Sequence, residues 1–174
     1  LFFNTSSALD SLPTQMLSSA ERTLILQQTH VAEYHFTPLF ANGEEHTFYA
    51  PNRAQNFCLR FDADGMTAEL RSNQSQFYLQ LSGYGYANRP SPVSEPQITA
   101  TGNTVEYRRS NLMEWYINDE RGVEQGFTLF SPPTLKNEKN TILQLEMVYD
   151  SLLTAHLVPD GQAILFRDAC GKTI

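Results

Sequence analysis

From Val31 to the end of the 174-residue chain, short runs in which every second residue is apolar alternate with turn residues. The run Phe57–Phe61 shows the pattern, and the Asp62–Gly65 sequence after it is typical of a hairpin turn. A spacing of two places the apolar side chains on one face of a strand. About ten such strands at regular intervals are typical of a sandwich or barrel, so the sequence predicts a mostly β fold, an antiparallel β-sandwich.

A proline-rich segment, Arg89–Pro96, divides the predicted strands. Proline removes a ladder donor and favours extended connectors. We therefore expect an N-terminal helical segment over 1–30 and a β-sandwich domain over 31–174, with two sheets or halves divided near 89–96. The predicted strands cover 34–36, 48–50, 57–61, 66–70, 77–81, 97–100, 104–108, 112–117, 125–130, 142–147, 152–158 and 163–167.

One helix is predicted, over Leu12–Gln28, where apolar residues from Met16 to Leu24 recur at helical spacing. Ser18 and Glu21 also match a capping box, which favours a later start. In either case the helix has one apolar face that can dock on the rest of the chain.

The charge of the chain restricts its partners. Nineteen acidic and twelve basic residues give a formal net charge of −7, which repels phosphate backbones and anionic lipid. The sequence therefore predicts no nucleic-acid partner. No apolar run approaches the roughly 20 residues that span a bilayer, so no membrane insertion is predicted. Because the chain starts at Leu1, we expect either a removed leader, as in a secreted or cell-surface protein, or a trimmed chain.

The two cysteines lie in different settings. Cys58 is within an apolar strand run, where a free buried thiol is the usual case, and Cys170 stands beside Gly171. Free thiols are favoured, and one disulfide between the two is the alternative.

Partial motifs for cofactors and metals are present but incomplete. The sequence Gly171–Thr173 resembles the end of a phosphate-binding loop, but Phe166 stands where that loop needs a glycine. The Asp62–Gly65 sequence opens like a calcium loop but lacks its later oxygen ligands. No spacing typical of zinc occurs among the histidines, which are His30, His35, His46 and His156. No cofactor and no metal are predicted.

Two groups of side chains could form a site. Tyr84, Trp115 and Tyr116 could stack on sugar rings, although burial preferences favour a place in the sandwich core for such rings. Glu114 and Glu124 could form the carboxylate pair of a glycoside hydrolase, although acidic residues beside a turn are usually solvated. No nucleophile elbow accompanies the serines.

Several stretches resemble the N-terminal region of large bacterial extracellular proteins that continue into FG-GAP-type or related β-propeller repeats. These stretches are Glu33–Phe36, Tyr49–Asn56, Leu59–Phe61 with Gly65, Val105–Leu129 and Leu157–Phe166. The resemblance implies a surface-exposed assembly, adhesion or display module, and it transfers no active-site residues.

The sequence thus predicts a non-catalytic structural or interaction module of a secreted or cell-surface protein, not an enzyme. Its partner is expected to be another protein or a second copy of the chain, because open sheet edges need protection. A carbohydrate-binding module with a glycan partner and a glycoside-acting enzyme are the two alternatives.

Overall fold

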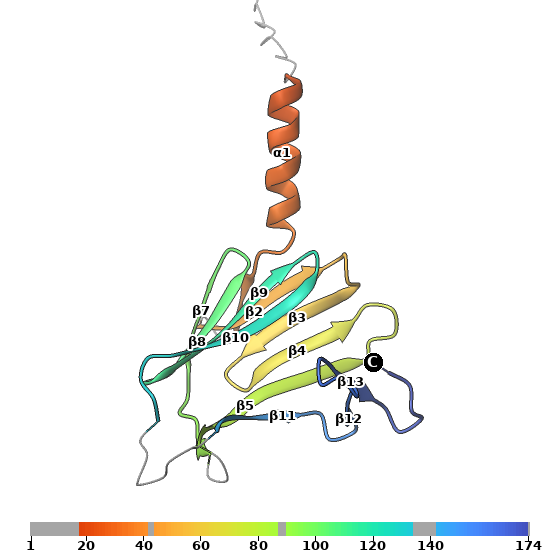
Figure 1. Ribbon diagram of the computed structural model, residues 1–174. Helices are drawn as coiled ribbons and strands as arrows, with labels where there is room; N and C mark the ends of the chain where they lie inside the picture. The colour runs from red at the N-terminus through yellow and green to blue at the C-terminus, as the bar shows by residue number, and fades with distance from the viewer. Residues whose placement is uncertain (1–17, 42–43, 87–89, 134–141, 174) are drawn as a thin grey trace, which may run out of the picture.

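The computed structural model describes residues 18–41, 44–86, 90–133 and 142–173. These residues form one α-helix and thirteen β-strands in antiparallel sheets, with no closed barrel, which confirms the predicted mostly β sandwich class. Two sheets face each other, and a small third sheet lies beside them (Figure 1).

The larger sheet, sheet A, has the strand order β1-β2-β3-β4-β5-β11, and β6 also pairs with β5. Its strands are β1 (Thr37–Ala41), β2 (Glu44–Asn52), β3 (Phe57–Asp62), β4 (Gly65–Leu70), β5 (Gln76–Tyr86), β6 (Ser91–Pro92) and β11 (Leu143–Tyr149). Sheet B has the order β10-β9-β8-β7, and the third sheet is the β12–β13 hairpin. Their strands are β7 (Gln97–Thr101), β8 (Thr104–Arg108), β9 (Leu112–Asp119), β10 (Gly122–Leu129), β12 (Thr154–Leu157) and β13 (Ile164–Arg167).

The proline-rich segment carries the chain from sheet A to sheet B. The chain leaves sheet A after β5 and β6 and enters sheet B at β7, and it returns to sheet A at β11. The two sheets are therefore not two consecutive halves of the sequence, because the last strand of sheet A comes after all of sheet B.

The predicted hairpin at Asp62–Gly65 joins β3 to β4. The side chain of Asp62 accepts a hydrogen bond from the Asp64 backbone N–H at 3.1 Å, which closes the turn. Gly65 has φ +142°, and a Cβ at this position would lie 2.5 Å from the Leu79 carbonyl oxygen. Only glycine fits here, both for its backbone angle and for its contact with β5.

Strand β9 alternates strictly between buried and half-buried residues, and its buried face includes Glu114, although an acidic residue beside a turn was expected to be solvated. Its inward side chains meet the inward face of sheet A around Phe61, whose ring is edge-on to Phe36 and Tyr116 at 5.1 and 4.8 Å between centroids. The core between the two sheets consists of Phe36, Phe48, Ala50, Leu59, Phe61, Met66, Val105, Tyr107 and Tyr116.

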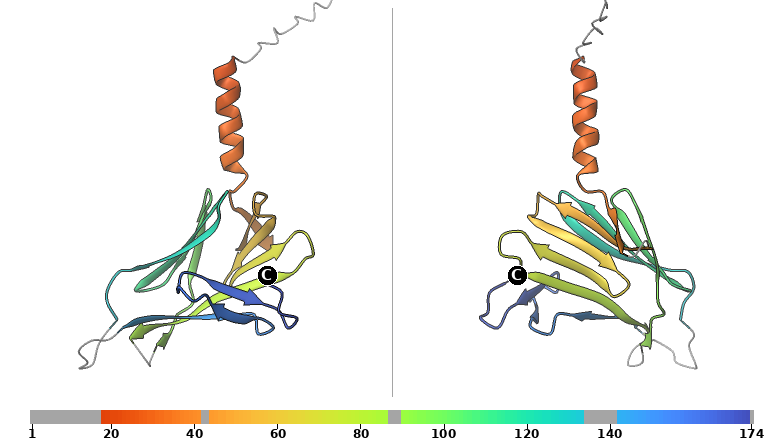
Figure 2. Two further views of the ribbon diagram at one scale, coloured as in Figure 1. Left: turned by 45° about the vertical axis from the view of Figure 1, so that its right-hand side comes forward. Right: turned by 180° about the vertical axis from the view of Figure 1, so that it is seen from behind.

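The two sheets lie close together below the helix and diverge away from it, as the left view of Figure 2 shows. The β12–β13 hairpin packs against sheet A beyond this core. Its Phe166 ring lies 4.7 Å from Phe77 of β5 and 5.0 Å from Tyr149 of β11, between centroids.

Helix α1 covers Ser19–Ala32, so it starts and ends later than the predicted Leu12–Gln28; residues 12–17 lie outside the described residues. The capping box decides the start: the Ser18 hydroxyl accepts from the Glu21 N–H at 3.2 Å, and the Glu21 carboxylate accepts from the Ser18 N–H at 2.7 Å. The helix projects from the sandwich (Figure 1) and does not dock on it.

The first strand also begins later than predicted. After the helix, the N–H groups of Tyr34 and His35 donate to carbonyls of the last helical turn, and the Phe36 N–H donates to the Gly102 carbonyl at 2.8 Å. Tyr34 and Phe36 are buried and His35 is exposed, so the alternation predicted burial correctly, although Glu33 and Tyr34 lie in a turn and not in a strand.

Candidate functional site

A polar cluster is buried on the inward face of sheet B. The Glu114 carboxylate is 2 % exposed, and it accepts hydrogen bonds from the Tyr116 hydroxyl at 2.6 Å, from Gln125 Nε2 at 2.8 Å and from an Arg109 guanidinium N–H at 3.2 Å. Arg109 also donates to the Ser94 carbonyl at 3.0 Å. Both carboxylate oxygens are therefore occupied by donors of this chain, and the charge of Glu114 is paired.

Two tyrosine hydroxyls beside this cluster are held protonated. Burial raises the pKa of Tyr116, and the negative charge of Glu114 raises it further. Burial, and then Glu114, likewise raise the pKa of Tyr107, whose hydroxyl donates to the carbonyls of Asp62 and Gly65 at 2.8 and 2.9 Å. Tyr107 thereby joins sheet B to the β3–β4 turn of sheet A.

The candidate carboxylate pair of a glycoside hydrolase does not converge. Glu124 lies opposite Ile117 in the β9–β10 register, whereas Glu114 lies opposite Phe127. Ile117 and Glu114 are an odd number of residues apart on β9, so their side chains point to opposite faces of the sheet. Glu114 is buried in the interior, and Glu124 is exposed on the outer face.

The three candidate stacking rings do not share a surface either. Tyr116 is 1 % exposed and belongs to the core, Trp115 is half-buried on the outer face of sheet B, and Tyr84 is half-buried in β5, opposite Leu145 of β11. The alternation of β9 separates Trp115 from Tyr116, because neighbouring residues of a strand face opposite sides.

The Trp115 side chain packs against a glycine on the outer face of sheet B. It lies opposite Gly126 of β10, and a Cβ at Gly126 would collide with the indole ring. The indole therefore rests directly on the backbone of β10. Its neighbour on the other side is Glu106 of β8.

A second buried polar group ties the two sheets together near the helix. Asn52 and Asn118 are both fully buried, and Asn52 Nδ2 donates to Asn118 Oδ1 at 2.8 Å. Asn118 Nδ2 donates to the carbonyls of Tyr34 and Pro51 at 3.0 and 3.2 Å. Because the amide groups of both asparagines are used within the fold, this pair fixes the register between the sheets.

The partial motifs form ordinary turns. Lys172 belongs to a turn in which its backbone N–H donates to Asp168 Oδ1 at 2.9 Å, with Gly171 in the left-handed region at φ +79°. Cys58 and Cys170 are both free thiols, and Cys58 Sγ lies 2.9 Å from the Tyr49 hydroxyl. Within the described residues, no group of three or more His, Cys, Asp or Glu side chains could hold a metal ion.

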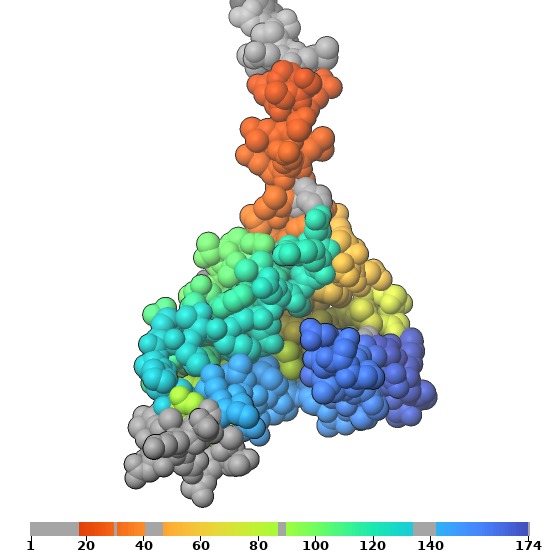
Figure 3. Space-filling view, viewed as in Figure 1, coloured from red at the N-terminus to blue at the C-terminus, as the bar shows by residue number. Residues whose placement is uncertain are grey.

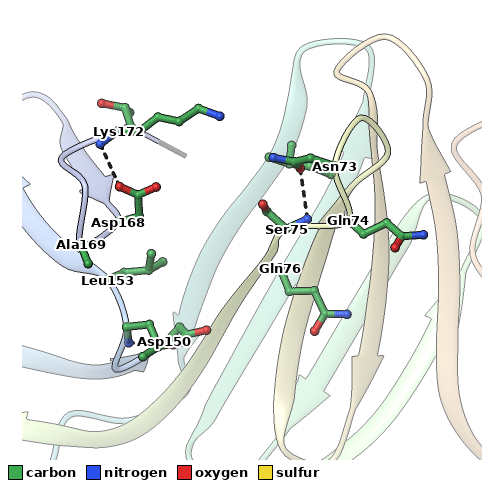
Figure 4. Close-up of a pocket in the computed structure, with 12 residues that line it drawn as sticks. Asn73, Gln74, Ser75, Gln76, Asp150, Leu153, Asp168, Ala169 and Lys172 are labelled. Carbon is green, nitrogen blue, oxygen red and sulfur yellow. Dashed lines mark hydrogen bonds between the residues drawn. The ribbon is translucent and has the colours of Figure 1, made fainter.

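A pocket lies between the C-terminal turns and the β4–β5 turn (Figure 4). It has an outer part of about 600 Å³ and an adjoining inner part of about 250 Å³, and Leu70 and Ser75 line both. The inner part is lined by Phe57, Ala68, Leu70, Ser75, Phe77 and Phe166. The sequence did not predict this pocket, because its walls come from segments about a hundred residues apart; the repeated phenylalanines were the only signal.

Helix α1 presents a second kind of candidate site, an apolar surface. Its described side chains are all exposed, including Leu24 at 55 % and Val31 at 56 % (Figure 3). At its base, Glu33 forms an ion pair with Arg53 at 3.0 Å, which anchors the helix to the β2–β3 turn. None of the helices formed by the described residues is long and apolar enough to cross a membrane.

Comparisons with known proteins give no relative: no family model, no curated protein and no solved structure matches this chain. The resemblance to the N-terminal region of FG-GAP-type proteins stays a prediction.

Proposed function

We propose that this chain is a non-catalytic interaction module of a secreted or cell-surface protein, and that it mediates assembly through helix α1. The observation that carries the proposal is the exposure of apolar side chains along a helix that stands clear of its own domain. A helix of 14 residues is marginally stable by itself in water, and most helices gain their stability from packing. A partner that covers α1 would supply that packing.

The side chains of α1 are arranged for contact with another helix. Ala20, Leu24, Gln27 and Val31 are spaced by four, three and four residues, which is the spacing of the seam in a coiled coil. The opposite side of the helix carries Arg22 and Glu33, together with Leu26. The seam therefore carries two large apolar side chains and no charge, whereas the opposite side carries one leucine and two charges.

The partner that we infer is helix α1 of a second copy of this chain. Two identical seams placed side by side bring Leu24 and Val31 of both copies into one apolar contact, as an isologous interface requires. The buried ionisable groups support a non-catalytic role, because Glu114 is already neutralised by Arg109 and bonded to Tyr116. Adhesion, and a place upstream of β-propeller repeats, are parts of this proposal that rest on the resemblance.

The test is sedimentation equilibrium of the wild-type chain and two matched variants. Leu24→Glu places a charge in the seam, and Leu26→Glu places the same charge about 200° around the helix. We expect the wild type to self-associate, Leu24→Glu to weaken association by at least about tenfold, and Leu26→Glu to leave it within about twofold. A wild type that stays monomeric at millimolar concentration, or equal loss in both variants, would contradict the proposal.

One observation favours carbohydrate binding as a second candidate function. The indole of Trp115 lies flat over Gly126 and beside Glu106, and a flat ring with a polar neighbour suits a sugar ring. Titration with oligosaccharides, followed by the fluorescence of this single tryptophan, tests the idea. Sugar-dependent quenching that is lost in Gly126→Val, which tilts the indole, would support it, and unchanged fluorescence with every sugar would remove it.

A further inference from the structure

We propose that the pocket under the C-terminal hairpin is a binding site for small aromatic amines, which place a ring in the inner part and an ammonium group at the mouth. The proposal is independent of assembly through helix α1, since none of the residues that line the pocket belongs to the helix.

The inner part of the pocket is a gap in the apolar face of sheet A. Phe57 pairs with Leu70, and Ala68 pairs with Phe77, so these four side chains share one face. Phe166 of β13 covers them from the other side and lies 4.7 Å from Phe77. The side chain of Ala68 is too short to reach across, which leaves about 250 Å³.

This gap suits an apolar ring better than water. Its walls are five apolar side chains, and Ser75 is the one polar residue that lines it. Water molecules beside these walls have few polar partners, whereas the apolar side chains accept an aromatic ring. A flat ring placed beside the Phe77–Phe166 pair would also gain aromatic contacts with these side chains.

The charged residues at the mouth of the pocket determine which charge the ligand's head group can carry. The mouth is lined by Asp150 and Asp168 against one cation, Lys172, so its formal charge is negative. Asn73, Gln74 and Gln76 add amide groups on the facing turn, and Figure 4 shows them across the opening from Asp150 and Asp168. The mouth therefore favours a cationic head over an anionic one.

Each carboxylate at the mouth is held in place by its own turn. Asp150 Oδ1 accepts from the Leu152 N–H at 2.8 Å, and Asp168 Oδ1 accepts from the N–H groups of Cys170 and Lys172, both at 2.9 Å. The two carboxylates thus face an incoming ammonium from fixed positions, with little reorganisation on binding.

The test uses two probes with the same ring and opposite charges, tryptamine and indole-3-propionate. Binding is followed by two-dimensional amide NMR, which reports Leu70, Phe77 and Phe166 directly and separates this pocket from Trp115. We expect both probes to shift these signals, with tryptamine bound about fivefold more tightly at low salt, a preference that falls as salt rises.

Ala68→Leu fills the inner part, and Ala54→Leu, in an exposed turn, is the matched control. We expect Ala68→Leu to weaken tryptamine binding by at least about tenfold and Ala54→Leu to leave it unchanged. Ala68→Val, a smaller change, gives an intermediate loss and guards against misfolding of the leucine variant. The proposal fails if neither probe shifts these signals at millimolar concentration, if Ala68→Leu binds as well as the wild type, or if indole-3-propionate binds as tightly as tryptamine.

Discussion

Two different elements pack against the inward face of sheet A, and one of them packs more closely than the other. Over Leu59 and Phe61 this face meets sheet B, whose Tyr107 and Tyr116 reach across, and all four residues are at most 1 % exposed. Over Phe57 and Phe77 it meets only the β12–β13 hairpin. Those two rings are half-buried, all four residues of β12 are exposed, and a cavity remains.

The comparison shows that the apolar face of one sheet does not determine its own packing. Strand β3 runs through both regions, with Phe57 under the hairpin and Leu59 and Phe61 under sheet B at alternate positions. A four-stranded sheet supplies rows of long side chains that interdigitate, whereas a two-stranded hairpin supplies one ring, Phe166, and few supporting neighbours. Well-packed structure lies under sheet B, and the ligand-sized space lies under the hairpin.

The largest expected effect is the loss of stability when a phenylalanine ring is removed from each of the two regions. Phe61→Ala removes a fully buried ring at the centre of the core and should lower the free energy of unfolding by about 3–5 kcal/mol. Phe166→Ala removes a half-buried ring beside an existing cavity and should cost about 1–2 kcal/mol. Urea denaturation measures both, and equal losses would mean that the hairpin is as tightly packed as sheet B.

The next effect tests the buried charges of sheet B. Arg109→Met leaves Glu114 without its cation in the interior and should destabilise the fold by about 3 kcal/mol. Arg108→Met is the matched control, because Arg108 is exposed and lies 4.9 Å over the Phe130 ring, a contact worth about 0.5–1 kcal/mol. Similar unfolding midpoints for the two variants would show that the Glu114 cluster is not structural.

One substitution should have opposite signs in the two regions. Ala50→Leu adds atoms to a residue that is fully buried in the core and should destabilise the protein by about 1–3 kcal/mol. Ala68→Leu fills the cavity under the hairpin and should stabilise it by about 0.5–2 kcal/mol. Thermal unfolding of both variants decides the sign, and a loss of stability in Ala68→Leu would mean that the cavity closes in solution.

The smallest expected effect is a pH dependence of stability that comes from the two buried tyrosines under sheet B. The pKa values of Tyr107 and Tyr116 are raised above the unfolded value of about 10, so the folded state keeps both protons where the unfolded state releases them. Stability is therefore fully present below about pH 10 and falls above it, by about 1.4 kcal/mol per pH unit for each tyrosine. Tyr116→Phe should reduce this slope by one tyrosine's share in urea titrations between pH 10 and 11; parallel curves for both proteins would contradict the assignment.

Much of the fold could be predicted from local patterns. The Asp62–Gly65 turn gave the hairpin between β3 and β4, and the Ser18 and Glu21 pair gave the start of α1 better than the apolar spacing did. These features depend on neighbours within a few residues, so the sequence contains the whole interaction.

The candidate sites could be predicted only in part. Glu114 and Glu124 are close in sequence but face opposite sides of sheet B. The register between β9 and β10 decides this, and the register cannot be read from the sequence alone. Arg109, the buried partner of Glu114, was not among the predicted site residues. Its role depends on hydrogen bonds to Ser94 and Glu114, and only the folded chain brings these two residues to the Arg109 side chain.

By itself, the sequence determined a mostly β antiparallel chain, its hairpin at Asp62–Gly65 and its capped helix, because periodicity and turn chemistry act over a few residues. Only the tertiary structure decided that β11 returns to sheet A, that helix α1 stands apart, and that Phe166 leaves a cavity over Ala68. These features depend on contacts between segments distant along the chain, and their outcome is set by which surfaces meet and how completely they fill the space between them.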